Sequence, residues 1–296
     1  MTIMILGASG FIGTNLTAYL ALNHPLILVS RNPNKLKALP NTQIIGWHEL
    51  EEDPTILKNV EVIINLCGQS ILGIWTKSYQ KKLLDSRIMP LKTLNRLLNQ
   101  VAHKPYIICA SGVGAYGYQT KEAYQNSFRE EDLPKHPTIL SNIAKDVEST
   151  LDSDLQAKTC YLRFGVVLST KGGSLPLMKI PHYFGMGMIV GDGNQPFSWV
   201  SLIDVLGIIE HAIEKHLLGK FNVTAPIADT NRTFNQSLAK AMHRPLWLRL
   251  PKFIAMLMGK MFIETILQGQ RVSSEKIQNT GYTFKTKHAS ELINPI

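Results

Sequence analysis

Short apolar runs alternate with segments of helical spacing along the first 165 residues. Residues 2–6 and 26–30 are apolar runs, and the segment between them, 11–22, has apolar positions at helical spacing, so the pattern predicts a strand, a helix and a strand. Further strands are expected near 43–47, 61–66, 105–110 and 158–164, and helices over 76–101 and near 138–152. The alternation predicts an α/β protein with a Rossmann-type, doubly wound parallel sheet, buried on both faces by helices.

The pattern changes after about residue 170, where glycines and prolines interrupt it. Helical spacing returns at 202–217 and 233–242, a short strand is expected near 246–250, and Phe253–Leu267 has the pattern of an amphipathic helix. We therefore expect residues 1–170 to form the core, completed by part of 197–225. Residues 171–296 are expected to form a small C-terminal α/β substrate lobe.

Composition and charge narrow the class of protein. The 296 residues are 45% hydrophobic and 18% charged, which is enough apolar material for a large core. The net charge of +9 would suit a nucleic-acid partner. However, the basic residues are scattered, with no run of five or six like charges and no cluster interleaved with aromatic residues. We therefore expect no nucleic-acid partner.

The cysteines and the hydropathy of the chain indicate in which cellular compartment the protein is found. Cys67, Cys109 and Cys160 are widely spaced, with no C-x-x-C pair, so neither a disulfide scaffold nor a zinc site is indicated. The first apolar stretch lacks a basic n-region, and no 18 apolar residues run together. These features predict a soluble, cytoplasmic protein without an integral membrane segment. The apolar face of the expected helix over Phe253–Leu267 is more typical of a helix in the core or at a dimer interface than of a membrane anchor. An oligomer could therefore form through this helix.

A glycine-rich loop opens the first predicted helix. Gly7-Ala8-Ser9-Gly10-Phe11-Ile12-Gly13 has the spacing G-x-x-G-x-x-G directly after the first strand. The first glycine suits a tight turn, the second a close approach of pyrophosphate, and the third the packing of helix on strand. The helix N-terminus would meet the anion. This context favours a dinucleotide site over a glycine-rich turn without a ligand.

The end of the second strand indicates which dinucleotide is bound. An NAD-binding fold places Asp or Glu there to bind the ribose 2′-hydroxyl, but this chain has Ser30-Arg31-Asn32 and no acid before Glu49. Arg31, with Ser30 beside it and Lys35 one turn on, can donate to a 2′-phosphate. We therefore expect NADP(H), the alternative being that Arg31 is only a solvated loop charge.

With these features the chain resembles the NAD(P)-dependent epimerase/dehydratase branch of the short-chain dehydrogenase/reductase superfamily. It is most similar to the atypical YfcH-like "epimerase family protein" group, which has a small C-terminal domain of unknown function, here about residues 246–294. The matching stretches span nearly the whole chain: Gly7–Gly13, Ser30–Pro33, Asn65–Gly68, Trp75-Thr76 with Ser86-Arg87, Arg163–Leu168, Trp199 with Asp204, and Gly269–Arg271.

The resemblance implies a cofactor site residue by residue. It implies pyrophosphate contacts from the glycine loop, 2′-phosphate contacts from Ser30 and Arg31, and a nicotinamide neighbour at Val167. The complete implied set is Gly7, Ser9, Gly10, Phe11, Ile12, Gly13, Ser30, Arg31, Leu66, Cys67, Gly68, Lys82, Arg87, Ser111, Arg163 and Val167. For Cys67, a buried filler at a strand end is the alternative to a reactive thiol.

The catalytic pair of the superfamily is missing. No tyrosine is followed by lysine four residues later, and the corresponding helix positions hold Leu140 and Ala144. Ser111 ends the fifth predicted strand at the ligand-binding edge, and Tyr116 is the nearest proton donor in sequence. Both are catalytic candidates, although a packed Tyr116 that donates one hydrogen bond is the stronger alternative.

Two function classes follow from these features. The first is an NADP(H)-dependent oxidoreductase or sugar-nucleotide-type epimerase/dehydratase with a small-molecule substrate. The second is a regulatory protein that senses NADPH without turnover, as the missing pair suggests. The dispersed histidines predict no metal site, and the lack of a G-x-S-x-G elbow argues against a serine hydrolase.

Overall fold

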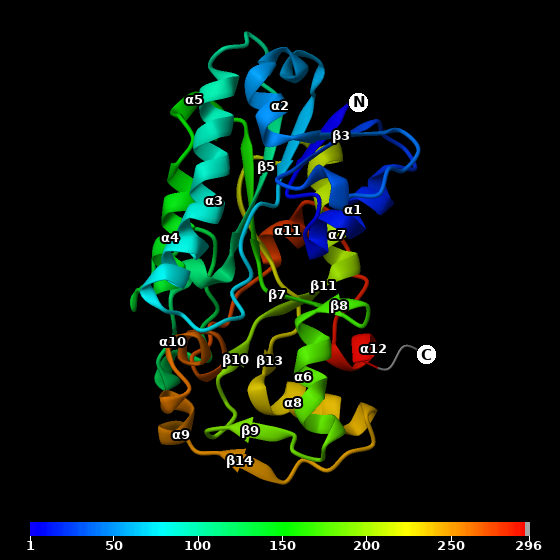
Figure 1. Ribbon diagram of the computed structural model, residues 1–296. Coiled ribbons are helices and arrows are strands. Elements are labelled where there is room, and N and C mark those ends of the chain that lie inside the picture. Colours follow the sequence, from blue (N-terminus) through cyan, green and yellow to red (C-terminus); the bar gives the residue numbers. More distant parts are fainter. Residues whose placement is uncertain (294–296) are drawn as a thin grey trace.

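A sheet of seven parallel strands forms the upper part of the molecule in Figure 1. The structure is a computed structural model and describes residues 1–293. Within these residues the strand order is β12-β6-β5-β4-β1-β2-β3, which confirms the predicted Rossmann-type sheet. The strands are β1 (Ile3–Leu6), β2 (Leu26–Ser30), β3 (Thr42–Gly46), β4 (Val62–Asn65), β5 (Tyr106–Gly112), β6 (Thr159–Phe164) and β12 (Gly219–Val223).

Helices bury both faces of this sheet. One face is covered by α1 (Phe11–Leu20) and α7 (Leu202–Lys215). The other is covered by α2 (Trp47–Glu52), α3 (Lys77–Leu98), α4 (Ile139–Ser149) and α5 (Ser153–Gln156). Successive residues of β1 point to opposite faces, with Ile3 and Ile5 against the first layer and Met4 and Leu6 against the second. Complete burial of each such side chain contributes about 1.5–3 kcal/mol.

The helices that frame the site begin at residues that suit a helix start. Thr76, Thr138 and Ser201 are the N-caps of α3, α4 and α7, and each hydroxyl accepts a hydrogen bond from a backbone N–H in the first turn. A cap of this kind is worth about 1 kcal/mol. Short 3-10 helices lie between the larger elements: η1 (Pro33–Lys35), η2 (Pro54–Asn59), η3 (Val113–Tyr116) and η4 (Lys121–Ala123).

The C-terminal lobe lies below the carboxyl edge of the main sheet in Figure 1 and contains small sheets with few residues each. Its strands are β7 (Val166–Ser169), β8 (Gly172–Gly173), β9 (Met188–Val190), β10 (Pro196–Phe197), β11 (Trp199–Ser201), β13 (Asp229–Thr230) and β14 (Leu248–Leu250). Its helices include α6 (Ser174–Tyr183), α8 (Asn231–Ala241) and α12 (Ala289–Ile293). The chain leaves the lobe through α7 and β12 to complete the main sheet, after which it returns to the lobe.

The expectation of one helix over Phe253–Leu267 is wrong. The segment forms α9 (Lys252–Leu257), α10 (Lys260–Phe262) and a π-helical turn, η5 (Ile263–Leu267). Gly259 separates the first two with a φ of +91° and an extended ψ of 174°, a backbone conformation that interrupts a helix and that glycine adopts without steric cost. A dimer seam along one continuous helix therefore has no basis in this structure.

Residues after α9 fasten the lobe to the core. Asp204 of α7 is fully buried, and its carboxylate accepts hydrogen bonds from the backbone N–H groups of Lys285 (2.7 Å) and Thr286 (3.1 Å) and from the Tyr282 hydroxyl. Upstream, the Gln270 amide donates to the Gly117 carbonyl at 2.8 Å. Helix α11 (Glu275–Asn279) lies between these two contacts in sequence. Asp204 and Gln270, both in stretches that carried the family resemblance, thus have structural roles.

Candidate functional site

The glycine loop joins β1 to α1 at the carboxyl edge of the sheet. Gly7 has a φ of +79°, and a Cβ there would lie 2.9 Å from the carbonyl carbon of Leu66. A Cβ on Gly13 would collide with the carbonyl oxygen of Gly7. The two glycines therefore let the loop, the end of β4 and the helix approach closely. Since β1 lies between β2 and β4, the loop occupies the position where the strand order reverses and where such sheets bind ligands.

The N-terminus of α1 suits an anion. Its N-cap is Gly10, and no side chain among residues 1–293 caps it. The N–H groups of a first helical turn have no partner within the helix and carry partial positive charge. Ser9 and Gly10 are exposed, whereas Phe11 and Ile12 are half-buried. The loop therefore has the donors and the open backbone that a dinucleotide pyrophosphate requires.

The end of β2 has the polarity expected for a 2′-phosphate. Ser30 is buried, and its hydroxyl donates to the Ser9 hydroxyl at 3.3 Å and accepts from the Asn32 N–H at 3.1 Å. Arg31 is exposed and forms no ion pair with any described residue. Glu49, the next acid, is committed to the backbone N–H of Gly46 at 3.3 Å. The structure thus places a free cation, and no competing carboxylate, beside the glycine loop.

The end of β4 contributes backbone to the same edge. The Cys67 N–H donates to the Asn65 side-chain oxygen at 3.1 Å, which fixes the turn. Burial raises the pKa of the Cys67 thiol to about 12, although nearby Arg31 opposes the shift. The thiol is therefore neutral at pH 7, and this geometry favours the buried-filler alternative for Cys67.

Arg87 of α3 reaches back to this turn. Its guanidinium donates to the carbonyl oxygens of Leu83 (2.9 Å) and Gln69 (3.1 Å), and burial lowers its pKa. A Cβ on Gly68 would lie 3.1 Å from the Arg87 Cζ, so glycine leaves room for the guanidinium over the backbone. Lys82, one and a half turns earlier, is exposed. Arg87 is therefore positioned by the protein itself, whereas Lys82 has no fixed partner among the described residues.

Ser111 lies at the end of β5, where its side chain contacts a buried acid. Its hydroxyl donates to Glu148 Oε1 of α4 at 2.9 Å. Glu148 also forms a bidentate ion pair with Arg163 of β6, at 2.7 Å for both contacts, and its Oε2 lies 3.0 Å from Lys220 Nζ. Burial opposes ionisation of Glu148, but the hydrogen bonds and charges of Arg163 and Lys220 outweigh it and hold the pKa below its ordinary value.

The same network holds Tyr116 away from solvent. The Tyr116 hydroxyl donates to the Asn222 side-chain oxygen at 2.7 Å and accepts from Arg163 Nη1 at 2.8 Å. The ring is fully buried and stacks on Phe128. Burial raises its pKa to about 12 despite the neighbouring guanidinium. This geometry favours the packed alternative for Tyr116, and it favours a supporting role for Arg163 over the expected cofactor contact, which stays a prediction.

The positions of the missing catalytic pair are filled by packing. The Leu140 side chain lies against η3, where a Cβ on Gly114 would meet its Cβ at 2.8 Å, and Ala144 is buried. The carboxylate of Glu264 accepts from the N–H groups of Ile139 and Leu140, each at 3.3 Å. Neither position of the pair therefore holds a proton donor. Val167, the expected nicotinamide neighbour, is half-buried in β7 and pairs with Val200 of β11.

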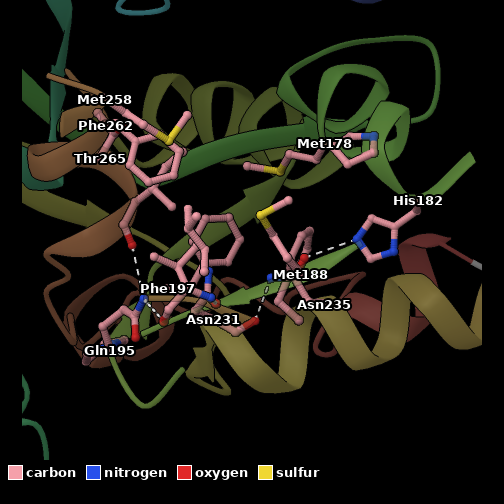
Figure 2. Close-up of a pocket in the computed structure, with 16 residues that line it drawn as sticks. Met178, His182, Met188, Gln195, Phe197, Asn231, Asn235, Met258, Phe262 and Thr265 are labelled. Atoms are coloured by element: carbon pink, nitrogen blue, oxygen red, sulfur yellow. Dashed lines mark hydrogen bonds between the residues drawn. The ribbon is translucent and has the colours of Figure 1, made fainter. Parts of the chain in front are cut away.

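A second feature, not expected from the sequence, is a cavity of about 340 Å³ inside the C-terminal lobe (Figure 2). We call it the lobe pocket. Its walls come from α6, β9, β10, α8, β14 and the segment from α9 to η5. Six apolar side chains make up much of the lining: Met178, Met188, Phe197, Phe234, Leu250 and Phe262. These residues belong to elements too short and too far apart in sequence to show a common pattern.

Two absences hold for the residues described. No group of three or more His, Cys, Asp or Glu side chains among residues 1–293 is arranged to hold a metal ion. In the same range, no helix combines the length and the apolar character needed to cross a membrane. Sequence reasoning missed three polar residues of the candidate site, which are Glu148, Lys220 and Asn222. A single Glu in a helix and a single Lys or Asn in a strand give no signal until the fold brings them together.

Comparison with known proteins places these features in a family. Residues 3–150 match the family described as "NAD dependent epimerase/dehydratase family". The "Epimerase family protein YfhF" of Bacillus subtilis is 33% identical over 290 residues, covering 96% of this chain and 94% of that protein. The predicted membership of the epimerase/dehydratase branch and its "epimerase family protein" group is confirmed.

Two solved structures resemble the whole chain. The human epimerase family protein SDR39U1 (isoform 2), crystallised with NADPH, has a TM-score of 0.87 and 29% identity, with 100% of this chain and 99% of that chain covered. A nucleoside-diphosphate sugar epimerase from Corynebacterium glutamicum has a TM-score of 0.76 and 26% identity. That match covers 99% of this chain but 57% of the other.

Proposed function

Because this chain belongs to the NAD dependent epimerase/dehydratase family, we propose that it is an NADP(H)-dependent oxidoreductase or epimerase-type enzyme acting on a small hydroxyl or carbonyl substrate. One observation carries the cofactor assignment. The glycine loop lies at the switch point of the sheet, and among residues 1–293 Arg31 forms no ion pair and no free carboxylate lies at the end of β2. The human relative with the same fold was crystallised with NADPH, which supports the proposal.

The chain's own residues divide the binding task. The amides of the loop from Gly7 to Gly13 would hold the pyrophosphate, and Ser30 with Arg31 the 2′-phosphate. The backbone of Leu66, Cys67 and Gly68 would line the same edge. A bound nicotinamide supplies hydride chemistry. The protein's part is to hold the substrate carbon close to it and to exclude water.

Ser111 is the polar side chain best placed to contact the substrate oxygen. Its hydroxyl proton is directed at Glu148, which leaves its lone pairs available to accept. A substrate hydroxyl could therefore donate to Ser111, whereas a carbonyl would require the Ser111 hydroxyl to rotate away from Glu148. Because Glu148 is ionised and held by Arg163 and Lys220, it is an anchor for Ser111 and not a proton donor.

A non-catalytic NADPH-sensing protein is the second candidate, favoured by one observation. The helix positions that would hold the catalytic tyrosine and lysine are Leu140 and Ala144, both packed against neighbours. A sensor needs the cofactor cradle but no proton donor. Location in the cytoplasm belongs to the same proposal and is supported by three free cysteines.

Titration of the purified protein with NADPH and with NADH, followed by nicotinamide fluorescence, tests the cofactor assignment. We expect NADPH to bind at micromolar concentrations and NADH at least tenfold more weakly. A panel of aldehydes and ketones with bound NADPH then separates the two candidates. Consumption of NADPH supports the enzyme, and tight binding without consumption for any compound supports the sensor. Binding of neither cofactor contradicts both.

A further inference from the structure

We propose that the lobe pocket binds the apolar part of an uncharged substrate, and that nucleotide-diphosphate compounds are excluded from it. The inference rests on the proposed function only for the reaction that such a ligand would undergo. The pocket, at about 340 Å³, is large enough for a small organic molecule, and its lining is mainly aliphatic, aromatic and methionine side chains (Figure 2).

Several polar groups on the pocket wall are occupied in building it. The Thr265 hydroxyl donates to the Met261 carbonyl at 2.7 Å, and the Gln195 amide nitrogen donates to the carbonyl oxygens of Val190 and Ile266. The Asn231 side-chain oxygen accepts from the Val190 N–H at 3.0 Å. These hydrogen bonds tie β9 to α8 and η5, so the polar atoms that make them stabilise the wall and are not directed at a ligand.

His182 is tied to the wall through one ring nitrogen, whereas its buried Nδ1 has no hydrogen-bond partner among the described residues and faces the backbone of Gly187. Asn235 Nδ2 donates to the Asn231 carbonyl at 2.7 Å, which leaves Asn235 Oδ1 as the acceptor for His182 Nε2 at 3.1 Å. The proton therefore lies on Nε2. The ring is almost fully buried, and burial lowers its pKa, with Asn235 opposing the shift. With a neutral His182, the lining contains no charged side chain among the residues that the structure describes, since none of its members is Lys, Arg, Asp or Glu.

The charge of the lining decides the class of ligand. A diphosphate or carboxylate buried in this pocket would meet no cation, and an unpaired buried charge costs several kcal/mol. An uncharged aliphatic or aromatic group gains about 25 cal/mol for each Å² of apolar surface removed from water. Met178 and Met188 are flexible and polarisable, so the walls can adapt to different apolar shapes.

The pocket is close to the predicted reaction site along the chain. Phe197 forms part of its wall, and three residues later Val200 pairs with Val167 of β7. Three residues of extended chain span at most about 10 Å and paired strands lie about 4.8 Å apart, so the wall lies within roughly 15 Å of Val167, the expected nicotinamide neighbour. A substrate that spans this distance can place an apolar tail in the pocket and its hydroxyl or carbonyl carbon at the edge of the main sheet.

Fluorescence binding of N-phenyl-1-naphthylamine, an uncharged apolar probe, to the full chain without cofactor tests the proposal. We expect saturable binding that 2-decanone displaces, while UDP and decanoate at pH 8 displace it at least tenfold less well. Met178→Trp fills the cavity and should weaken probe binding at least tenfold. Leu177→Trp is the matched control, since Leu177 is the adjacent residue of α6 and is 52% exposed.

Two further measurements keep the outcomes distinct. NADPH titration and thermal unfolding of each variant show whether it is folded, and if Met178→Trp does not fold, Met188→Trp in β9 replaces it. Displacement by UDP, or equal probe binding by the cavity-filled and control variants, overturns the pocket assignment even if NADPH binds. Probe and ketone binding as expected in a protein that binds no NADPH supports the pocket and contradicts the proposed function.

Discussion

Arg31 is the residue on which cofactor choice depends. A charge-assisted contact of an exposed guanidinium with a 2′-phosphate is worth about 1.5–3 kcal/mol. We expect Arg31→Ala to weaken NADPH binding roughly 10- to 150-fold and to leave NADH binding nearly unchanged, as measured by fluorescence titration. Lys58→Ala is the control, because it removes the same charge from η2, before β4 begins. Equal losses for the two cofactors would contradict the 2′-phosphate assignment.

Glu148 is the residue whose loss should affect folding most. Replacing it with Gln leaves the buried guanidinium of Arg163 without its counter-ion, which costs about 3–5 kcal/mol. We expect Glu148→Gln to lower the free energy of unfolding at pH 7 by that amount, as measured in urea. Glu131→Gln, at an exposed position, is the control and should change stability by less than about 0.5 kcal/mol.

The same carboxylate gives the stability a pH dependence. Because the pKa of Glu148 is lower in the folded chain than its ordinary value of 4.5, its ionisation stabilises the fold above that value. The contribution is lost as the pH falls through the lower folded pKa. The difference in stability between the native chain and Glu148→Gln should therefore be constant from pH 6 to 8 and shrink below about pH 4.5. A difference that grows on acidification would contradict the ion-pair account.

The three cysteines should be unreactive in the folded chain. Burial raises the pKa of each thiol to about 12, and the thiolate is the reactive form. We expect Ellman's reagent at pH 8 to react slowly with the native chain and to report all three thiols at once in urea. Rapid labelling of Cys67 in the native chain would restore the reactive-thiol alternative for that residue.

At the scale of elements, the break between α9 and α10 depends on Gly259. A Cβ there would meet nothing within 4 Å, so the cost of a side chain comes only from the φ of +91°. We expect Gly259→Ala to lower the free energy of unfolding by about 1–2 kcal/mol. Gly112→Ala is the control, because its φ is −146° and its nearest contacts are ordinary at 3.8 Å. Similar effects of the two substitutions would show that backbone conformation does not end α9.

The elements of the main sheet could be predicted from the sequence because their apolar runs are strong and local. The runs at 26–30 and 61–66 became β2 and β4, buried on both faces as the pattern indicated. In the lobe, strands such as β10 have two residues and are fixed by tertiary pairing, which leaves no periodicity to detect. The prediction of one helix over Phe253–Leu267 failed for a related reason. An apolar stripe does not reveal that one glycine within it adopts a positive φ.

The candidate site, like the fold, could be predicted from the sequence only in part. The glycine loop and Arg31 lie next to the ends of strands that the pattern located, so their convergence followed from the topology. Glu148, Arg163 and Asn222 belong to α4, β6 and β12, and they meet only because β6 lies between β5 and β12. The lobe pocket depends on packing among elements that are spread from α6 to η5, which no local pattern encodes.

At the scale of the whole molecule, the core cannot be separated by cutting at residue 170. A fragment of residues 1–170 lacks α7, which covers one face of the sheet, and β12, which pairs with β6. We expect the fragment to show no cooperative thermal transition by circular dichroism and to aggregate in size-exclusion chromatography, because β6 would be an unprotected edge. The full chain is the control. A monomeric fragment with a cooperative transition would show that residues 1–170 fold independently.

The late return of β12 also affects how the chain is made. Arg163 of β6 is synthesised 59 residues before Asn222, the acceptor for the Tyr116 hydroxyl that Arg163 contacts. At about 5–20 residues per second, this corresponds to roughly 3–12 s of translation. During that interval the growing polypeptide has an open sheet edge and a polar cluster whose last members have not yet left the ribosome. The speed of translation through 164–222 therefore sets how long the nascent chain is exposed to edge-to-edge aggregation.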